Sequence, residues 1–587
     1  MSRVFSRGAM SLLVMISVII LSSFGVEIYE AMEHSHEHVM LVNFFVIAVL
    51  FVLSFLVFYV SRLVKLPSFV VAIFMGIAGK NLLGPVVGNN EILGVIVSLG
   101  ATLILFSGGL EIPFSNFRKL IWKIFSLSFV GLFLTAFALS WAVWFLGANL
   151  GFVISIPVAV LLGAVLCSTD PAAIIPVLKS LRFKNRSVKD IVISESAVTD
   201  VVGTLMTIVF LSIAVSGTVS GGINQWYQSI FNIDSAIILV KQLVFGVAAG
   251  LAGYIFLEAL LRVKRFYGRE FEADAAFFLS VPIIIFTLAL FAGGSGYLAA
   301  FVAGLIFHIT EHLNETEVFF NSLVDGFLKP TIFILLGALV DLGSLIEYAP
   351  IGILVALIFM LVIRPFSVFM SLGAFKYFGK DDLSWNDLLF ISFVRETGAI
   401  PAVLMLTIVS LGLGDISGLV EIGMWVILLT LVIEPMLTPF VARKLGVAEI
   451  IQNERPTILS DKASVMLVTR GKSVLKRLPF VIEWAKRHNV EEISVMLCLE
   501  NNYTPEYEKE IEEELEKVFE ATKKELREQG LPEIEFSFLS KKGFLHDNIE
   551  EIAKMDNRIS TIFVGKKMLD YHLGEIKDLG IPFYFMD

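Results

Sequence analysis

Long apolar runs recur along the first three quarters of the chain, and short polar connections separate them. Each run has about 18 residues or more, which is enough for a helix to cross the hydrocarbon core of a bilayer. The pattern predicts a polytopic, all-α membrane domain over residues 39–443. Its thirteen segments are expected at 39–61, 66–84, 91–112, 121–147, 153–179, 187–216, 234–263, 272–292, 294–311, 322–345, 348–375, 385–411 and 419–443.

After residue 443 the pattern changes to short apolar runs of strand type that alternate with helical stretches. Such alternation predicts a parallel sheet with helical layers. We therefore expect a separate soluble α/β domain over residues 444–587. The predicted strands are 464–469, 493–499, 534–539, 560–565 and 582–586, and the longest predicted helix is 506–529.

Residues 1–38 precede the membrane domain and begin with Arg3 and Arg7, followed by an apolar run from Met10 to Leu21. This order is typical of a signal peptide, and it is equally compatible with an extra helix that stays in the protein. The stretch from Glu33 to His38 is rich in histidine. We interpret it as a solvated external loop, with a transition-metal site as the alternative.

Composition and charge exclude several classes of protein. Hydrophobic residues make up 56% of the chain and charged residues 17%, with a mean hydropathy of +0.81, whereas a soluble protein has about a quarter charged residues. The net charge of −10 comes without a basic stripe, which argues against nucleic-acid binding. Cys167 and Cys498 are the two cysteines, so neither a disulfide framework nor a CxxC metal site is available.

Lysine and arginine concentrate in the connections after segments 1, 3, 5, 7 and 11. The positive-inside rule places these connections in the cytoplasm, and with them Arg443, Lys444 and the soluble domain. We therefore expect a multi-pass protein of the cell membrane, either a plasma membrane or a bacterial inner membrane, whose C-terminal domain is cytoplasmic.

Six segments, a linker at 234–263 and six more segments form two halves that enter the membrane from opposite sides. The fifth segment of the first half contains Asp170-Pro171, and the fifth segment of the second contains Glu396 and Pro401. Proline removes a backbone donor and clashes with the preceding turn, so both helices are expected to break there. Matching breaks in two inverted six-helix repeats are typical of secondary transporters.

Charged residues inside membrane helices are costly, at about 2.5 to 3.5 kcal/mol each on insertion scales, and therefore indicate a partner or a function. Four acids and two arginines leave two carboxylates that must be protonated or bind a cation. Ser196 and Asp200 share one helical face, and we expect Glu195 on the adjacent face to pair with Arg364. The buried charges predicted are Asp170, Glu195, Asp200, Arg364, Arg395 and Glu396, of which the roles of Arg395 and Glu396 stay open.

At these residues the sequence resembles the monovalent cation:proton antiporter superfamily, which exchanges Na⁺ or K⁺ for protons. The resemblance spans residues 40–443. It rests on Phe106-x-x-Gly109-Leu110-Glu111, Thr169-Asp170-Pro171, Glu195-Ser196-x-x-Thr199-Asp200, Arg364-Pro365 and Gly398-Ala399-Ile400-Pro401, in that order along the chain.

The resemblance implies a homodimeric secondary transporter, not an enzyme, that works by alternating access and contributes to pH homeostasis. In it Asp200 would bind the cation and the proton in turn, with Ser196 and the carbonyl of Thr169 as further ligands. Asp170 would lie where the two broken helices cross. Glu195 and Arg364 would form a structural ion pair. No metal beyond the transported cation is implied.

Two positions depart from the family pattern. Thr199 stands where the electroneutral branch usually has Asn and the electrogenic branch has a second Asp. Because threonine does not titrate in this pH range, the resemblance is closer to the electroneutral branch. Thr397 stands where that branch often has an arginine directly before the glycine, with Arg395 two residues earlier, so that arginine's role is not transferred.

The C-terminal domain resembles a universal stress protein. It lacks the closely spaced glycines that let backbone amides approach a phosphate, so we expect no nucleotide cofactor. Assembly, stability and regulation are all open as its role. Two alternative functions follow: a potassium efflux antiporter gated by a ligand of this domain, or a membrane sensor with a transporter-like body.

Overall fold

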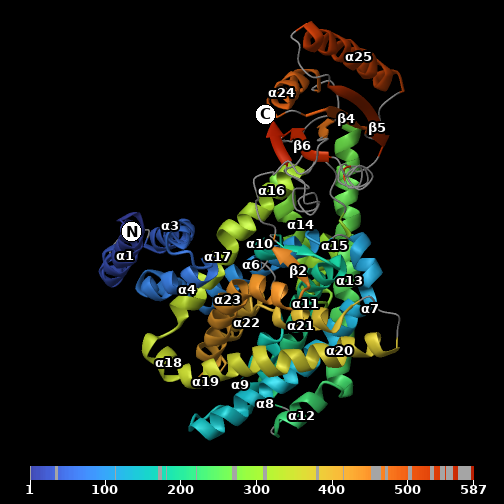
Figure 1. The fold of residues 1–587 in the computed structure, drawn as a ribbon. Coiled ribbons are helices and arrows are strands. Elements are labelled where there is room, and N and C mark those ends of the chain that lie inside the picture. Colours follow the sequence, from blue (N-terminus) through green and yellow to red (C-terminus); the bar gives the residue numbers. More distant parts are fainter. Residues whose placement is uncertain are drawn as a thin grey trace. The chain divides into compact units, whose positions relative to one another are not determined.

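The structure is a computed structural model of the 587-residue chain. Two compact units divide the chain, Met1–Glu449 and Ile450–Asp587. The first is helical and the second is built on a parallel sheet (Figure 1). The structure describes residues 2–586 without 34–37, 113, 170–174, 180, 218, 220, 268–273, 308–313, 379–382, 414–415, 451–463, 470–473, 489, 500–504, 529–533, 543–548, 550–558 and 566–582.

Apolar helices form the first unit, because a helix satisfies its own backbone hydrogen bonds without water. Helices lie in each of the thirteen predicted ranges. Within the described residues, eight helices are long and apolar enough to cross a membrane, or up to ten if each of two bent pairs is one span. The unit is therefore a multi-span membrane domain, and the exact number of spans stays a prediction.

The helices of the first part of the chain surround one extended apolar core. They are α1 (Ser2–Ser23), α2 (Gly25–Glu33), α3 (His38–Val64), α4 (Ser68–Ala78), η1 (Lys80–Leu83), α5 (Gly84–Val87), α6 (Asn90–Leu110), α7 (Phe114–Phe125), η2 (Ser126–Gly131), α8 (Leu132–Leu150), α9 (Ile156–Leu166), α10 (Ile175–Lys179), α11 (Arg186–Ser216) and α12 (Ile223–Ser229).

The long helix α13 (Ile233–Tyr267) leads into the second part of the unit. The helices that follow are α14 (Asp274–Phe291), α15 (Gly296–Ile306), α16 (Asn314–Leu323), η4 (Val324–Leu328), α17 (Lys329–Leu339), α18 (Leu342–Glu347), α19 (Ala349–Ile358), η5 (Phe359–Ile363), α20 (Arg364–Phe378), α21 (Trp385–Phe393), α22 (Ala399–Ser410) and α23 (Leu419–Lys444). Three stretches of the unit, η2 between α7 and α8 and η4 and η5 in this second part, are π-helical. This form is found mostly as single turns inside α-helices.

Glycines allow two pairs of helices to pack with their backbones in contact. A Cβ atom on Gly76 of α4 would lie 2.0 Å from the carbonyl oxygen of Ile334 of α17, and one on Gly337 of α17 would lie 2.1 Å from that of Ile73. The pair α6 and α15 repeats the arrangement, because Cβ atoms on Gly109 and Gly304 would lie 2.4 Å and 2.3 Å from backbone oxygens of the opposite helix.

The N-terminal helices contact the membrane domain through specific hydrogen bonds. The backbone N–H of Asn81 donates to the hydroxyl of Ser22 at 3.3 Å, and the hydroxyl of Tyr29 donates to the carbonyl of Leu82. The ring of Tyr29 also meets Phe45 of α3 edge-on, with 5.9 Å between centroids. Whether this segment is cleaved stays open, and residues 34–37 of the histidine-rich loop lie outside the described residues.

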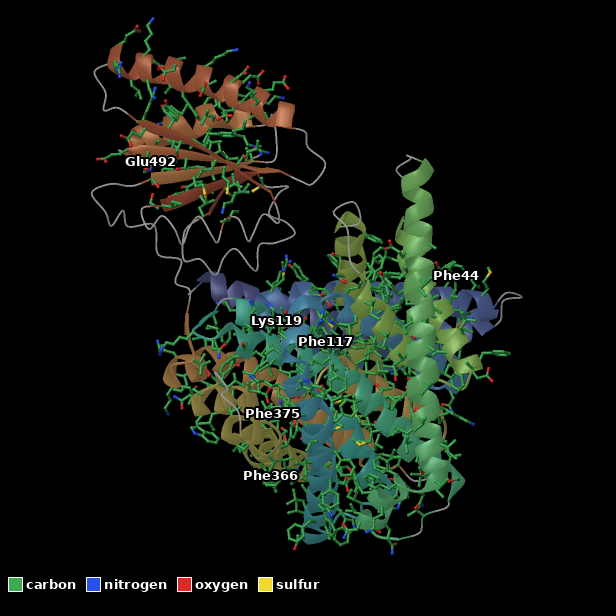
Figure 2. The ribbon with its side chains drawn as sticks, turned by 90° about the vertical axis from the view of Figure 1, so that its right-hand side faces the viewer. Phe44, Phe117, Lys119, Phe366, Phe375 and Glu492 are labelled. Carbon is green, nitrogen blue, oxygen red and sulfur yellow. The ribbon has the colours of Figure 1, made fainter. Side chains whose placement is uncertain are left out.

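Large apolar side chains cover much of the outside of the first unit, as Phe44 on α3 and Phe366 on α20 illustrate (Figure 2). Water would penalise so many exposed apolar groups, whereas lipid chains accept them. A short pairing of β1 (Leu181–Phe183) with β2 (Ala448–Ile450) connects the entry to α11 with the residues after α23.

The second unit contains a five-stranded parallel sheet with the order β5-β4-β3-β6-β7, which bears out the predicted α/β architecture. Apolar residues of α24 and α25, the helices whose bounds are given below, pack with those of strands β3 and β4 in one core. The universal stress protein resemblance stays a prediction. The elements are β3 (Ser464–Thr469), α24 (Val474–Arg487), β4 (Glu492–Leu499), α25 (Pro505–Glu528), β5 (Glu535–Lys542), β6 (Ile559–Gly565) and β7 (Phe583–Met586).

Candidate functional site

Two helices of the first unit are interrupted where the sequence predicts breaks. The first break separates α9, which ends at Leu166, from α10, which begins at Ile175. The second break is residues 394–398, between α21 and α22. Pro401 lies in the first turn of α22, where a missing backbone N–H removes no helical hydrogen bond. Asp170 of the first break lies outside the described residues.

Helix α11 packs directly against the first break. Ser196 donates its hydroxyl hydrogen to the backbone carbonyl of Thr169, and the hydroxyl of Thr199 lies 3.1 Å from that of Thr169. Thr199 also donates to the carbonyl of Ser196 at 2.8 Å. A Cβ atom on Gly203 would lie 2.8 Å from the Cβ of Ser168, so this glycine permits the close approach.

Asp200 lies one helical turn after Ser196 on the same face of α11. Its side chain is buried, with 7% of the residue exposed, and Thr204 donates to its backbone carbonyl at 2.7 Å. The structure therefore brings the carboxylate-bearing face of α11, a hydroxyl and an unwound peptide into one buried region. These are oxygen ligands of the kind that broken membrane helices offer to Na⁺ or protons in transporters.

Glu195 contacts two arginines. Nη2 of Arg364 donates to Oε2 of Glu195 at 2.9 Å, and Nη1 of Arg395 lies 3.7 Å from Oε1 of the same carboxylate. All three side chains are almost completely buried. Arg395 also donates through Nη2 to the backbone carbonyl of Cys167. Arg395, whose role the sequence left open, thus connects the second break to the end of α9.

Glu434 of α23 is a buried charged residue that is absent from the sequence prediction. It is 2% exposed, and its Oε2 accepts a hydrogen bond of 2.9 Å from the backbone N–H of Arg395. The sequence did contain a signal, since Glu434 precedes Pro435 within an apolar segment. The predicted set of buried charges therefore lacks Glu434, and it also lacks Asp387 and Lys329, each of which is 6% exposed.

Thr430, one turn before Glu434, contacts the same break. Its Oγ1 accepts a 3.2 Å hydrogen bond from the backbone N–H of Thr397 and lies 2.8 Å from the hydroxyl oxygen of Thr397. Two side chains of α23 thus receive two backbone donors of the extended segment. Glu396 lies between these donors and is buried.

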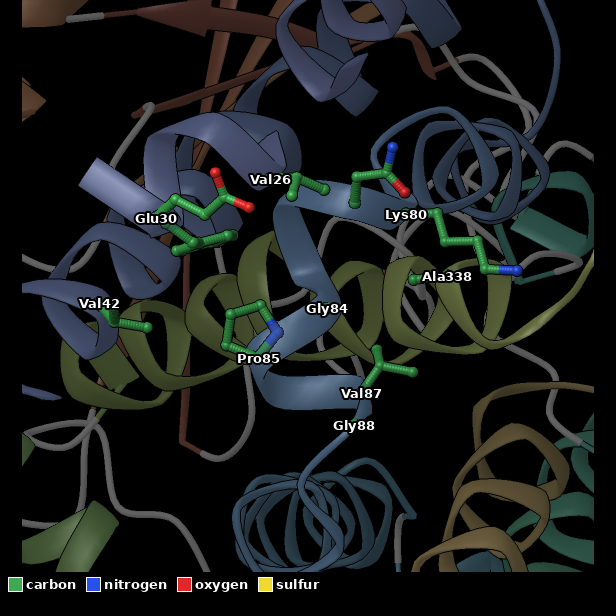
Figure 3. Close-up of a pocket in the computed structure, with 11 residues that line it drawn as sticks. Val26, Glu30, Val42, Lys80, Gly84, Pro85, Val87, Gly88 and Ala338 are labelled. Atoms are coloured by element: carbon green, nitrogen blue, oxygen red, sulfur yellow. The ribbon is translucent and has the colours of Figure 1, made fainter. Parts of the chain in front are cut away.

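A cavity of about 630 Å³ lies elsewhere in the first unit (Figure 3). Glu30, Lys80 and Pro85 are among the residues that line it, and they come from α2, η1 and α5. None of the buried charges described above lines this cavity. The candidate site is therefore the pair of breaks with α11 and α23.

The model of the transmembrane sodium/hydrogen exchanger family matches residues 51–444, two thirds of the chain. The chain belongs to this family. The match covers both breaks and every buried charge named above, and it confirms the resemblance to cation:proton antiporters.

Curated relatives of this sodium/hydrogen exchanger family member carry antiporter names. The K⁺/H⁺ antiporter NhaP of Alkalimonas amylolytica is 28% identical over 375 residues, which are 62% of this chain and 59% of that protein. The K⁺/H⁺ antiporter NhaP2 of Shewanella sp. strain MR-4 is 26% identical over 399 residues, or 67% of this chain and 65% of that protein. The chain spans about three fifths of the length of these relatives.

The solved structure of the sodium proton antiporter MjNhaP1 from Methanocaldococcus jannaschii at pH 8 has the same fold. It superposes with a TM-score of 0.54 at 23% identity and covers 68% of this chain and 99% of its own. At this identity the likeness speaks for the fold alone.

Proposed function

We propose that this family member exchanges a monovalent cation, Na⁺ or K⁺, for H⁺ across the membrane by alternating access. The observation that carries the proposal is the contact of Ser196 with the Thr169 carbonyl at the first break, one turn from Asp200. Cation and proton would compete for Asp200, with these two oxygens as further cation ligands and Asp170 at the crossing of the breaks.

The division of the buried charges supports Asp200 as the group that changes state. Glu195 lies against two arginines, and Glu434 accepts a backbone hydrogen bond at the second break. Both carboxylates therefore suit a structural role. Thr199 carries no second titrating group, so one proton for one cation is the stoichiometry that this arrangement favours.

An inverted repeat is part of the proposal. The contact of α4 with α17 joins the second helix of one half to the third helix of the other, and the contact of α6 with α15 joins the same two positions with the halves exchanged. A two-fold relation between the halves accounts for this reciprocity. Movement of one helical group against the other would then expose the same site to either side.

Orientation, assembly and the role of the second unit complete the proposal. The distribution of lysine and arginine favours a cytoplasmic C-terminal domain and a location in a cell membrane. The resemblance to cation:proton antiporters favours a homodimer. For the second unit we propose a role in assembly, stability or regulation, which truncation after the membrane domain and a transport assay would separate.

The proposal is tested in proteoliposomes by following lumenal pH after addition of Na⁺, K⁺, Li⁺ or Rb⁺. The wild-type protein should move protons in response to at least one cation, and Asp200→Asn should abolish the response, because an amide neither titrates nor neutralises a cation. Glu91→Gln, at the exposed start of α6, is the matched control and should stay active. Proton flux of wild-type size from a correctly folded Asp200→Asn protein would remove Asp200 from the mechanism.

A further inference from the structure

Helix α7 presents two different faces. Phe117 and Ile124 are buried, and α7 packs against α11. Arg118 and Lys119 are exposed, and Trp122 is 77% exposed; Figure 2 labels Phe117 and Lys119 on this part of the unit. Residues 114–131 contain no acidic residue. The outer face of α7 is therefore basic.

Aromatic side chains continue this face along the helix. Trp122, Phe125 and Phe129 follow Arg118 at helical spacing, and all three are exposed. The rings of Phe125 and Phe129 are stacked, with centroids 5.2 Å apart and planes within 2°. The face thus passes from guanidinium and ammonium groups to an indole and then to two phenyl rings.

The length of the helix indicates at which depth each part lies. The span Phe117–Leu150 has 34 residues, which is about 51 Å at 1.5 Å per residue, whereas the hydrocarbon core is about 30 Å thick. Residues 124–150 contain no charged residue and can occupy the core. Arg118 and Lys119 then lie among the headgroups, and Trp122 lies at the interface that tryptophan favours.

We propose that this face binds an anionic phospholipid of the cytoplasmic leaflet. The phosphate would lie against Arg118 and Lys119, and an acyl chain would lie along Phe125 and Phe129. Charge complementarity selects an anionic headgroup, because basic clusters beside a membrane helix attract anionic lipids. The location in the cytoplasmic leaflet follows from the positive-inside orientation of this end of the helix.

The lipid site connects to the buried charges through η2, which continues α7. Ser128 of η2 donates to the backbone carbonyl of Glu195 at 3.4 Å, and Ser126 donates to the carbonyl of Ser371 of α20 at 2.8 Å. Helix α20 begins at Arg364, the partner of Glu195. A lipid bound to α7 would thus lie on a helix that is hydrogen-bonded, through η2, to both helices of this ion pair. Binding of the lipid can be measured without transport.

Binding is measured on the purified full-length protein by native mass spectrometry with dioleoyl phosphatidylglycerol. Each basic residue near an anionic membrane surface strengthens lipid binding, and its loss lowers the affinity. Arg118→Gln combined with Lys119→Gln should therefore weaken binding of the lipid roughly 30-fold. Arg62→Gln with Lys65→Gln, at the exposed end of α3, removes the same charge elsewhere and should leave the affinity unchanged. Equal affinity of wild type and the Arg118/Lys119 variant, or equal weakening in both variants, would overturn the site.

Two further arms identify the ligand. Dioleoyl phosphatidylcholine and glycerol 3-phosphate should bind far more weakly than phosphatidylglycerol, and equal binding of glycerol 3-phosphate would reduce the site to a simple phosphate site. Replacement of Trp122 by p-benzoylphenylalanine in native membranes should give a photo-adduct with a phospholipid. A cross-link to the acidic helix α25 instead of lipid would assign this face to the chain's own C-terminal domain.

Discussion

Glu195 forms ion pairs with two arginines, so the loss of Glu195 and the loss of Arg364 should destabilise the protein to different extents. Removing one partner of a buried ion pair costs about 3 to 5 kcal/mol, because the other charge remains without compensation. Glu195→Ala leaves both Arg364 and Arg395 in this state, whereas Arg364→Ala leaves Glu195 with Arg395 at 3.7 Å. We expect Glu195→Ala to lower yield and melting temperature more than Arg364→Ala. Equal losses in thermal unfolding of the detergent-purified variants would contradict a shared carboxylate.

Substitutions of Glu434 can distinguish its role as a hydrogen-bond acceptor for the Arg395 N–H from the role of its negative charge. The N–H of Arg395 also donates to the Phe393 carbonyl at 3.1 Å, so Glu434→Ala removes one of its two acceptors. Loss of a hydrogen bond to a carboxylate costs about 1.5 to 3 kcal/mol in the free energy of unfolding. Glu434→Gln keeps an oxygen at that place and should recover more than half of the lost melting temperature. If the two variants unfold at the same temperature, the negative charge and not the hydrogen bond accounts for the residue.

At this scale the sequence predicted the meeting of Glu195 with Arg364 but not the contacts of Arg395. An isolated arginine in an apolar segment requires a buried acid, and few acids were available. The contact between Arg395 and the Cys167 carbonyl depends on how two helices far apart in sequence cross, which no local pattern encodes. Glu434 was different, since it met the criterion applied to the other buried charges and was overlooked.

Between elements, adjacent glycines of α6 offer a matched test of backbone contact. Gly109→Ala would place a methyl group 2.4 Å from the Phe301 carbonyl oxygen, whereas nothing lies within 4 Å of a Cβ on Gly108. Overpacking of this kind costs about 1 to 3 kcal/mol, so Gly109→Ala should lower the melting temperature and Gly108→Ala should not. Equal melting temperatures for the two variants would show that α6 and α15 can separate at little cost.

Hydropathy predicted where helices lie, and proline predicted where two of them break. Hydropathy did not predict which helices pack together, such as α4 with α17. Helices in lipid associate through small residues and close packing, not through hydrophobicity. The strands of the second unit were predicted to within a few residues from short β-rich runs bounded by polar ones. Strand order depends on crossovers and was not predicted.

For the whole molecule, a single carboxylate that changes state makes exchange electroneutral. Asp200 would hold one proton or one monovalent cation, so the moving part carries the same charge in both directions. The cation gradient that balances a fixed pH gradient in proteoliposomes should then not shift when a valinomycin potential is imposed, or a suitable substitute if K⁺ is the substrate. A balance point that moves with voltage would bring a second carboxylate, with Glu396 as the first candidate, into the transport step.

Arg395 holds the end of α9 with its side chain and is itself held by α23 through its backbone. The two interruptions therefore share contacts of one residue, and we expect a displacement of either break to move the other. In genetic terms, substitutions at one break and substitutions at the other should affect each other's phenotype. A substitution that distorts the peptide at Thr169 should find its compensating changes around residues 394–398 and on α23, far away in sequence, sooner than in the helix that carries it.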